Sequence, residues 1–120
     1  MACERQKVEE LFMELCKQPM LQFPQEREQL EAPSEPAAYV IRKGKIVLHV
    51  GRTLRGKDGL YQRLKNHLYG SSSFTEKYLK GNGAALRKGH TYQFLVVEDA
   101  RLRALLEAYA TGTLCQSTSD

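Results

Sequence analysis

The sequence predicts an α/β fold in which a small three-stranded sheet is flanked by helices. Two β-branched and aromatic runs, 39–41 and 46–48, enclose a polar turn that contains Gly44, which is typical of a β-hairpin. A third run of this kind spans residues 90–97. Helical spacing of apolar residues recurs before, between and after these runs, and a three-stranded sheet needs such helices to cover it.

The first expected element is an amphipathic helix over residues 4–17. Val8, Leu11, Phe12 and Leu15 recur at helical spacing, and charged residues occupy the other faces. This helix could cover a hydrophobic face, or it could contact a second copy of the chain or a partner protein. All four prolines fall within residues 19–36, so a connector without regular structure is expected there. Residues 1–35 should therefore precede a domain at 36–110.

After the hairpin, a polar loop at 52–59 leads to a predicted helix over 59–68. Leu60, Leu64 and Leu68 would lie on its buried side. Arg63 and His67 are four residues apart, so they project together from an adjacent face.

The remainder of the chain predicts a short helix over 74–79, the third strand and a last helix over 99–109. Ser73, three residues before Glu76, is the expected N-cap of the short helix. The basic, glycine-rich stretch at 80–89 is equally compatible with a phosphate cradle and with a mobile loop. The last helix should bury a stripe of four side chains, and residues 111–120 should form a flexible tail. The stripe is Leu102, Leu105, Leu106 and Tyr109.

Charge is concentrated in the middle of the chain. Residues 36–97 contain twelve Lys or Arg against only Asp58 and Glu76, a balance of +10, whereas the whole chain has a net charge of +4. Such a segment favours a polyanionic partner, because each cation placed on a phosphate releases a counterion. Nucleic acid is the expected polyanion, with DNA favoured over RNA but RNA not excluded by the sequence. The expected contacts are Arg52, Arg55, Lys57, Lys65, Lys77, Lys80, Arg87 and Lys88.

Other classes of protein are disfavoured by composition. The three cysteines, Cys3, Cys16 and Cys115, are odd in number and far apart, which argues against a disulfide framework and a zinc knuckle. No apolar run approaches the length of a membrane span, and the acidic N-terminus does not match a secretion signal. We therefore expect an intracellular protein, cytoplasmic or in the nucleoid or nucleus, without a membrane partner.

The order of these elements resembles the GIY-YIG nuclease superfamily over residues 37–107, which are 71 of the 120 residues. Ala37-Ala38-Tyr39 stands where the family has Gly-Ile-Tyr, and His49-Val50-Gly51 stands where it has Tyr-Ile-Gly. The following helix carries an arginine, and the last helix carries a glutamate. The sequence departs from the family in a longer loop at 52–59 and in the absence of an Asn after Glu107.

The resemblance implies phosphodiester hydrolysis with one divalent metal ion, Mg²⁺ or Mn²⁺. Tyr39 would be the general base or would orient the attacking water, and His49 would stand in for the second tyrosine. Arg63 would hold the phosphate in the transition state, and His67 would lie near the water. Glu107 would bind the metal ion. These five side chains should then converge on one face of the domain.

Each of these residues also has an ordinary structural role open to it. Tyr39 alone would be a core aromatic residue of a strand, and Glu107 alone would be an exposed helical carboxylate. The retained set favours an active endonuclease, whereas the Tyr-to-His change at position 49 and the missing Asn favour a catalytically inactive nucleic-acid-binding module on the same scaffold.

Overall fold

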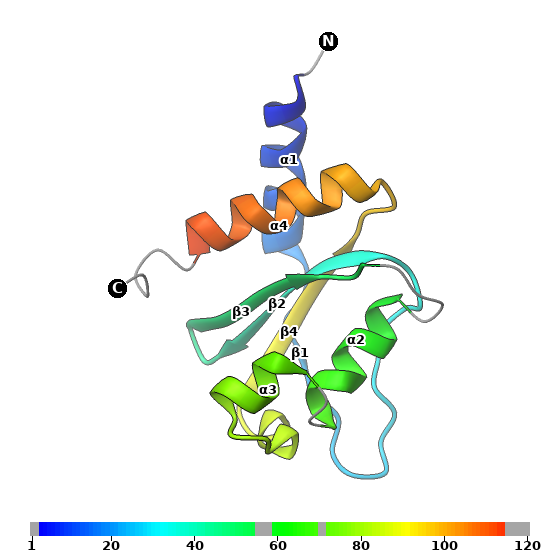
Figure 1. The fold of residues 1–120 in the computed structure, drawn as a ribbon, viewed down its shortest axis with the longest axis vertical. Helices are drawn as coiled ribbons and strands as arrows, with labels where there is room; N and C mark the ends of the chain where they lie inside the picture. Colours follow the sequence, from blue (N-terminus) through cyan, green and yellow to red (C-terminus); the bar gives the residue numbers. More distant parts are fainter. Residues whose placement is uncertain (1–2, 55–58, 70–71, 115–120) are drawn as a thin grey trace.

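One antiparallel sheet lies between two layers of helices (Figure 1). This computed structural model describes residues 3–54, 59–69 and 72–114. The predicted α/β class is confirmed. The elements are α1 (Glu4–Lys17), β1 (Leu21–Gln22), β2 (Ala37–Lys43), β3 (Ile46–Arg52), α2 (Gly59–Leu68), α3 (Ser73–Tyr78), the 3₁₀ helix η1 (Gly83–Arg87), β4 (His90–Val96) and α4 (Ala100–Leu114).

The sheet has four strands in the order β1-β4-β2-β3, so the prediction of three strands was wrong. The additional strand comes from the proline-containing connector, where Leu21 pairs with Tyr92 and Gln22 pairs with Thr91. Two residues are too few to produce a strand pattern in the sequence, and β1 forms only because β4 offers it an edge. β2 and β4 are central, and β3 lies at the other edge.

Alternate residues of the strands supply two separate cores, because successive side chains point to opposite faces of a sheet. On one face Ala38, Val40 and Val50 pack with residues of α1 and α4. On the other face Tyr39 and Ile41 pack with α2, α3 and η1. Figure 1 shows α1 and α4 on one side of the sheet, and α2 and α3 on the other.

The first helix covers a hydrophobic face, which was one of the two roles expected of it. Val8 and Leu15 of α1 are buried, and Leu15 belongs to the core that α4 completes. At the start of α1, Glu4 forms an exposed ion pair with Arg101 of α4, with an N–O distance of 2.7 Å. The hydrophobic spacing of the sequence thus gives both the bounds and the buried side of α1.

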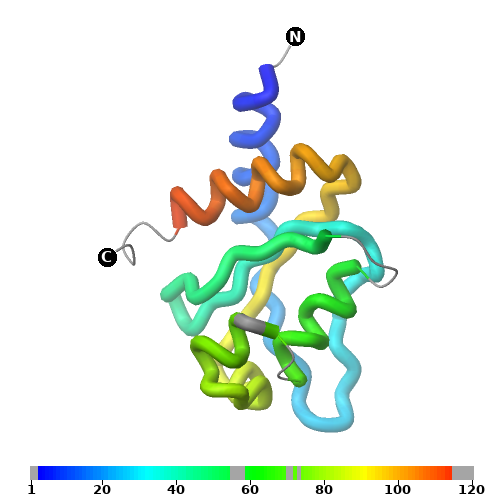
Figure 2. The backbone as a smooth tube through the Cα atoms, viewed as in Figure 1, coloured from blue at the N-terminus to red at the C-terminus, as the bar shows by residue number. Residues whose placement is uncertain are grey.

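The connector between β1 and β2 runs beside α2 and fixes the start of that helix (Figure 2). The backbone N–H of Leu60 donates to the carbonyl of Glu35, and that of Tyr61 donates to the carbonyl of Pro33. Gly59 begins α2 with φ +45°, and a Cβ there would lie 2.5 Å from the Glu35 carbonyl oxygen. These contacts hold the start of α2 against the residues that lead into β2.

Two helix ends differ from expectation. The N-cap of α3 is Ser72 rather than Ser73, because the Ser72 hydroxyl accepts a hydrogen bond from the backbone N–H of Thr75. α4 begins at Ala100 and extends to Leu114, so it includes four residues of the predicted flexible tail, and the rest of that tail lies outside the described residues.

The predicted core stripe of α4 was only partly right. Leu106 is fully buried, but Tyr109 is exposed and packs its ring edge against Phe12 of α1. Arg103 and Ala110 are buried instead. The helix is therefore turned on the sheet so that one arginine faces the interior.

Candidate functional site

Four of the predicted catalytic side chains meet at the hydroxyl of Tyr39. Its Oη lies 2.6 Å from Nε2 of His67 and 3.5 Å from Nε2 of His49, and it accepts a hydrogen bond of 3.3 Å from Nε of Arg63. Tyr39 comes from β2, His49 from β3, and the other two from adjacent turns of α2. The four-residue spacing lets Arg63 and His67 project together from one face of α2, and in the structure both reach the Tyr39 hydroxyl.

Gly51 makes room for this cluster. Gly51 is paired with Tyr39 across the two strands, and the tyrosine ring lies directly over it. A Cβ on Gly51 would lie 2.5 Å from the Tyr39 hydroxyl and 2.9 Å from Nε2 of His49. The glycine of the His-Val-Gly segment is thus required by the close approach of two side chains.

The direction of each hydrogen bond in the cluster can be assigned by starting from the Thr75 hydroxyl, because each hydroxyl has one proton to donate. The Thr75 hydroxyl donates to the backbone carbonyl of His67, and the Ser72 hydroxyl donates to Oγ1 of Thr75 at 3.0 Å. Ser72 therefore accepts from Nδ1–H of His67 at 2.6 Å. In a neutral imidazole the other nitrogen is then an acceptor, so Tyr39 donates its proton to Nε2 of His67. Its oxygen accepts from Arg63.

Burial keeps three of these groups neutral near pH 7. It raises the pKa of Tyr39 to about 12, against the opposing effect of Arg63. Burial lowers the pKa of His49 to about 4 and that of His67 to about 3, with Arg63 adding to both shifts. The guanidinium of Arg63 is therefore the charge of this four-residue cluster.

Accessibility differs within the cluster. Tyr39 is 0% exposed and belongs to the core, as does His67, whereas His49 and Arg63 are half-buried. The structure thus gives Tyr39 the ordinary role of a core aromatic residue and, in addition, makes its hydroxyl the hub of a polar cluster. A ligand that approaches from solvent would meet His49 and Arg63 first.

Glu107 is not among the side chains that contact the Tyr39 hydroxyl, so its convergence with the other four stays a prediction. It belongs to α4, whose core lies on the opposite side of the sheet from Tyr39. Its Oε1 lies 3.4 Å from Nε of Arg52, at the end of β3. The Glu107 carboxylate nevertheless contributes to the raised pKa of Tyr39.

A divalent ion at Glu107 would depend on one carboxylate. In the part of the chain that the structure describes, no group of three or more His, Cys, Asp or Glu residues could hold a metal ion. Mg²⁺ retains most of its waters, and one carboxylate plus a substrate phosphate can hold it. The Glu107 side chain is 31% exposed and fits that requirement. The ion would have to share Glu107 with Arg52, whose buried Nε has no hydrogen-bond acceptor among the described residues.

The predicted nucleic-acid contacts fall into three groups. Arg52 is paired with Glu107, and Arg87 donates a 2.5 Å hydrogen bond to the carbonyl of Pro24, so both have structural partners. Arg55 and Lys57 lie outside the described residues. The other predicted contacts are exposed: Lys65, Lys77, Lys80 and Lys88.

Arg103 is a supporting residue that the sequence did not indicate. Its guanidinium donates to the carbonyls of Thr53 at 3.0 Å, Val97 at 2.9 Å and Leu54 at 3.3 Å. It thus ties the chain leaving β3 to the chain leaving β4. In the sequence it resembles any other charged helical residue, and its position three residues before Leu106 was the available signal.

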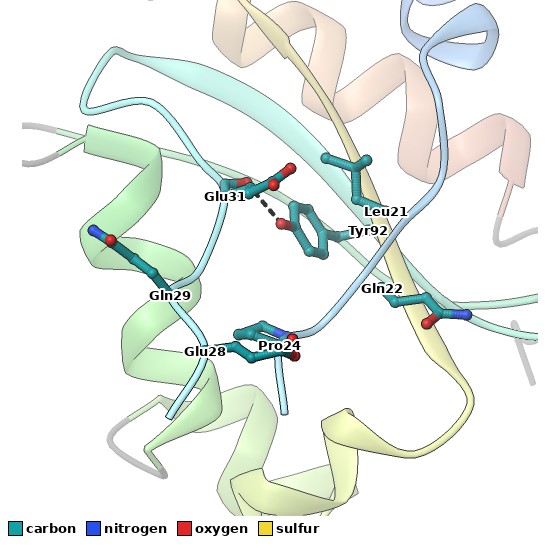
Figure 3. Close-up of a pocket in the computed structure, with 7 residues that line it drawn as sticks. All are labelled: Leu21, Gln22, Pro24, Glu28, Gln29, Glu31 and Tyr92. Atoms are coloured by element: carbon teal, nitrogen blue, oxygen red, sulfur yellow. Dashed lines mark hydrogen bonds between the residues drawn. The ribbon is translucent and has the colours of Figure 1, made fainter. Parts of the chain in front are cut away.

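A hollow of about 440 Å³ lies beside β1, at the edge of the sheet opposite β3 (Figure 3). Its lining includes Glu28 and Glu31, and the Tyr92 hydroxyl donates to the Glu31 carbonyl at 2.6 Å. None of the predicted catalytic residues lines it. Its carboxylates make it a poor place for a polyanion, so the cluster at Tyr39 remains the candidate site.

Comparison with known proteins adds no assignment. No protein-family model, no curated protein and no solved structure matches the chain. Within the described residues, no helix is both long enough and apolar enough to cross a membrane. The function of the chain must therefore be inferred from the arrangement of its own residues.

Proposed function

We propose that the chain is a GIY-YIG-type endonuclease domain that hydrolyses phosphodiester bonds of nucleic acid at the β3 edge of the sheet. The observation that carries the proposal is the meeting of His49, Arg63 and His67 at the Tyr39 hydroxyl. Polar groups are costly to bury, and packing of the core does not need a phenol hydroxyl, two imidazoles and a guanidinium at one point. A cluster of proton acceptors with one guanidinium suits a reaction that moves a proton beside a phosphate.

Arg63 would bind the phosphate. Its half-buried guanidinium is held by the hydrogen bond from Nε to Tyr39 and remains partly open to solvent. A guanidinium in that position stabilises the negative charge that develops on the phosphate oxygens.

His49 would accept the proton of the attacking water. It is neutral near pH 7 and half-buried, whereas Tyr39 is fully buried and has a pKa of about 12. Arg63 contributes to the lowered pKa of His49. A phosphate bound at Arg63 would offset that charge and make the imidazole a better base. We therefore assign Tyr39 to holding the histidines and Arg63 in place, rather than to direct proton abstraction.

Glu107 would hold the metal ion. Arg52 would either leave the Glu107 carboxylate or share it with the ion. The ion would supply charge neutralisation on the phosphate and a bound water. The effect of Glu107 on the pKa of Tyr39 supports this assignment, because it means that the carboxylate and the cluster lie within electrostatic range of one another.

The test is cleavage of labelled DNA and RNA oligonucleotides with Mg²⁺ or Mn²⁺. Arg63→Ala and Glu107→Gln should each lower cleavage by at least about 100-fold, while nucleic-acid binding falls only slightly. Arg5→Ala and Glu10→Gln, exposed residues of the remote helix α1, are the matched controls and should leave cleavage unchanged. Cleavage that survives Glu107→Gln would contradict the proposed metal site.

The second candidate is a catalytically inactive nucleic-acid-binding module. The complete burial of Tyr39 and the ion pair between Arg52 and Glu107 favour it. This alternative predicts stabilisation by nucleic acid in a thermal-shift assay, no effect of Mg²⁺ or Mn²⁺, and no cleavage. For the endonuclease and for the inactive module alike, the affinity for nucleic acid should fall as the salt concentration rises, because binding releases counterions from the phosphates.

A further inference from the structure

Three aromatic rings lead from the polar cluster to the surface. The His49 ring stacks on Phe74, with centroids 4.7 Å apart and an interplanar angle of 27°. Phe74 in turn lies 5.4 Å from the ring of Tyr78, at 36°. Phe74 is 3% exposed, whereas Tyr78 is 57% exposed. The outer ring therefore presents much of its surface to solvent only two ring-to-ring steps from the candidate base.

A cation accompanies the exposed ring. Nζ of Lys77 lies 5.7 Å from the centroid of the Tyr78 ring. Lys77 is itself exposed, so its ammonium group is available to a phosphate. An aromatic face beside a cation is the combination with which proteins bind single-stranded nucleic acid: the ring stacks on a base and the cation meets the backbone.

The helix that carries this pair is fixed to the cluster. The Ser72 hydroxyl accepts from His67 and from the backbone N–H of Thr75, so one serine both caps α3 and orients the buried histidine. The Thr75 hydroxyl donates back to the His67 carbonyl. Tyr78 is consequently held at a set distance from His49, which a subsite for a neighbouring nucleotide requires.

We propose that Tyr78 and Lys77 form a stacking subsite for an unpaired base of the nucleotide next to the phosphate held at Arg63. This inference rests on the proposed function and specifies its substrate class. A base inside a duplex is stacked on both faces, so it could reach Tyr78 only after it leaves the stack. The preferred substrate is therefore a single strand, or a junction with an unpaired nucleotide, rather than a fully paired duplex.

The experiment measures binding of the full chain to three oligonucleotides of one sequence: single-stranded DNA, single-stranded RNA and duplex DNA. Each single strand carries one 2-aminopurine, whose fluorescence reports stacking on an aromatic ring. We expect tighter binding of a single strand than of the duplex. Tyr78→Ala should weaken single-strand binding by roughly 10-fold or more, the effect of losing one stacked base. It should also abolish the fluorescence change, whereas Tyr78→Phe, which keeps the ring, should retain both.

Tyr69→Ala is the matched control. Tyr69 is 67% exposed and follows α2, but it borders a hollow shared with Pro24 and Leu68 on the connector side of the domain. Loss of that ring should leave single-strand affinity and fluorescence unchanged. Both tyrosines are exposed, but only Tyr78 lies next to Phe74, which stacks on His49 of the cluster. A difference between the two variants therefore measures the effect of a ring beside the cluster rather than the loss of any exposed ring.

Outcomes separate this inference from the proposed function. Tighter binding of single-stranded DNA or of single-stranded RNA than of the duplex, lost in Tyr78→Ala, supports the inference. The strand that binds more tightly shows whether the base comes from DNA or RNA. Equal affinity of wild type and Tyr78→Ala, or duplex binding as tight as single-strand binding, overturns it. If cleavage still depends on Glu107 in that case, the proposed function stands without this subsite. Absence of any nucleic-acid binding removes both.

Discussion

Replacement of Gly51 by alanine tests whether the packing around Tyr39 is as close as the structure has it. The new Cβ would lie 2.5 Å from the Tyr39 hydroxyl, 2.6 Å from its Cζ and 2.9 Å from Nε2 of His49. All three distances are shorter than van der Waals contact, and the tyrosine ring is fully buried. The ring cannot move outward without disturbing its hydrogen bonds to His67 and Arg63.

The expected cost is that of adding a methyl group to a filled core, about 1–3 kcal/mol of unfolding free energy. Gly112→Ala is the matched control, because Gly112 lies in α4 and a Cβ added there would meet no neighbouring atom within 4 Å. The same substitution there should be neutral or should stabilise the chain by up to about 1 kcal/mol, through the greater helix propensity of alanine. Both variants replace a glycine by an alanine, but Gly51→Ala should lower the free energy of unfolding and Gly112→Ala should leave it unchanged or raise it.

Urea unfolding followed by circular dichroism measures both variants. Tyr39→Phe in the Gly51→Ala background should not restore wild-type stability, because the ring carbon at 2.6 Å remains and the hydrogen bonds to His67 and Arg63 are lost. If Gly51→Ala proves as stable as wild type, the close approach of Tyr39 to β3 is wrong, and the cluster geometry must be wrong with it.

Two further predictions concern charge in and beside the cluster. Because the folded-state pKa of His67, about 3, lies below its unfolded value of about 6.5, the unfolded chain binds more protons between these values. The contribution of His67 to stability should therefore be complete above pH 6.5 and fall by up to about 1.4 kcal/mol per pH unit below it, and His49, whose pKa is lowered to about 4, adds to this fall. Equal urea midpoints near pH 7 and pH 5 would contradict this. Arg52→Gln frees the Glu107 carboxylate from its ion pair, so Mn²⁺ affinity measured by calorimetry should rise roughly two- to five-fold. Lys65→Gln is the control, and weaker Mn²⁺ binding by Arg52→Gln would mean that the arginine supports the metal site.

Local sequence patterns were sufficient for the elements that carry the cluster. The hairpin and α2 follow from the β-branched runs, the glycine turn and the leucine spacing, and the four-residue spacing of Arg63 and His67 places both on one face of α2. The short strand β1 could not be predicted, because its two residues become a strand only by pairing with β4. The cap at Ser72 was missed by one position, since a run of serines offers several equivalent hydroxyls and His67 selects among them.

The sequence by itself determined the α/β class, the concentration of positive charge at 36–97 and the set of side chains that could form a site. The tertiary structure decided which of these side chains contact one another and which protonation state each of them has. Only long-range packing buries Tyr39 and His67 and so shifts their pKa values. The same packing sets Glu107 on the opposite layer, paired with Arg52. Burial and charge proximity depend on residues distant in the chain, and local patterns in a sequence do not record them.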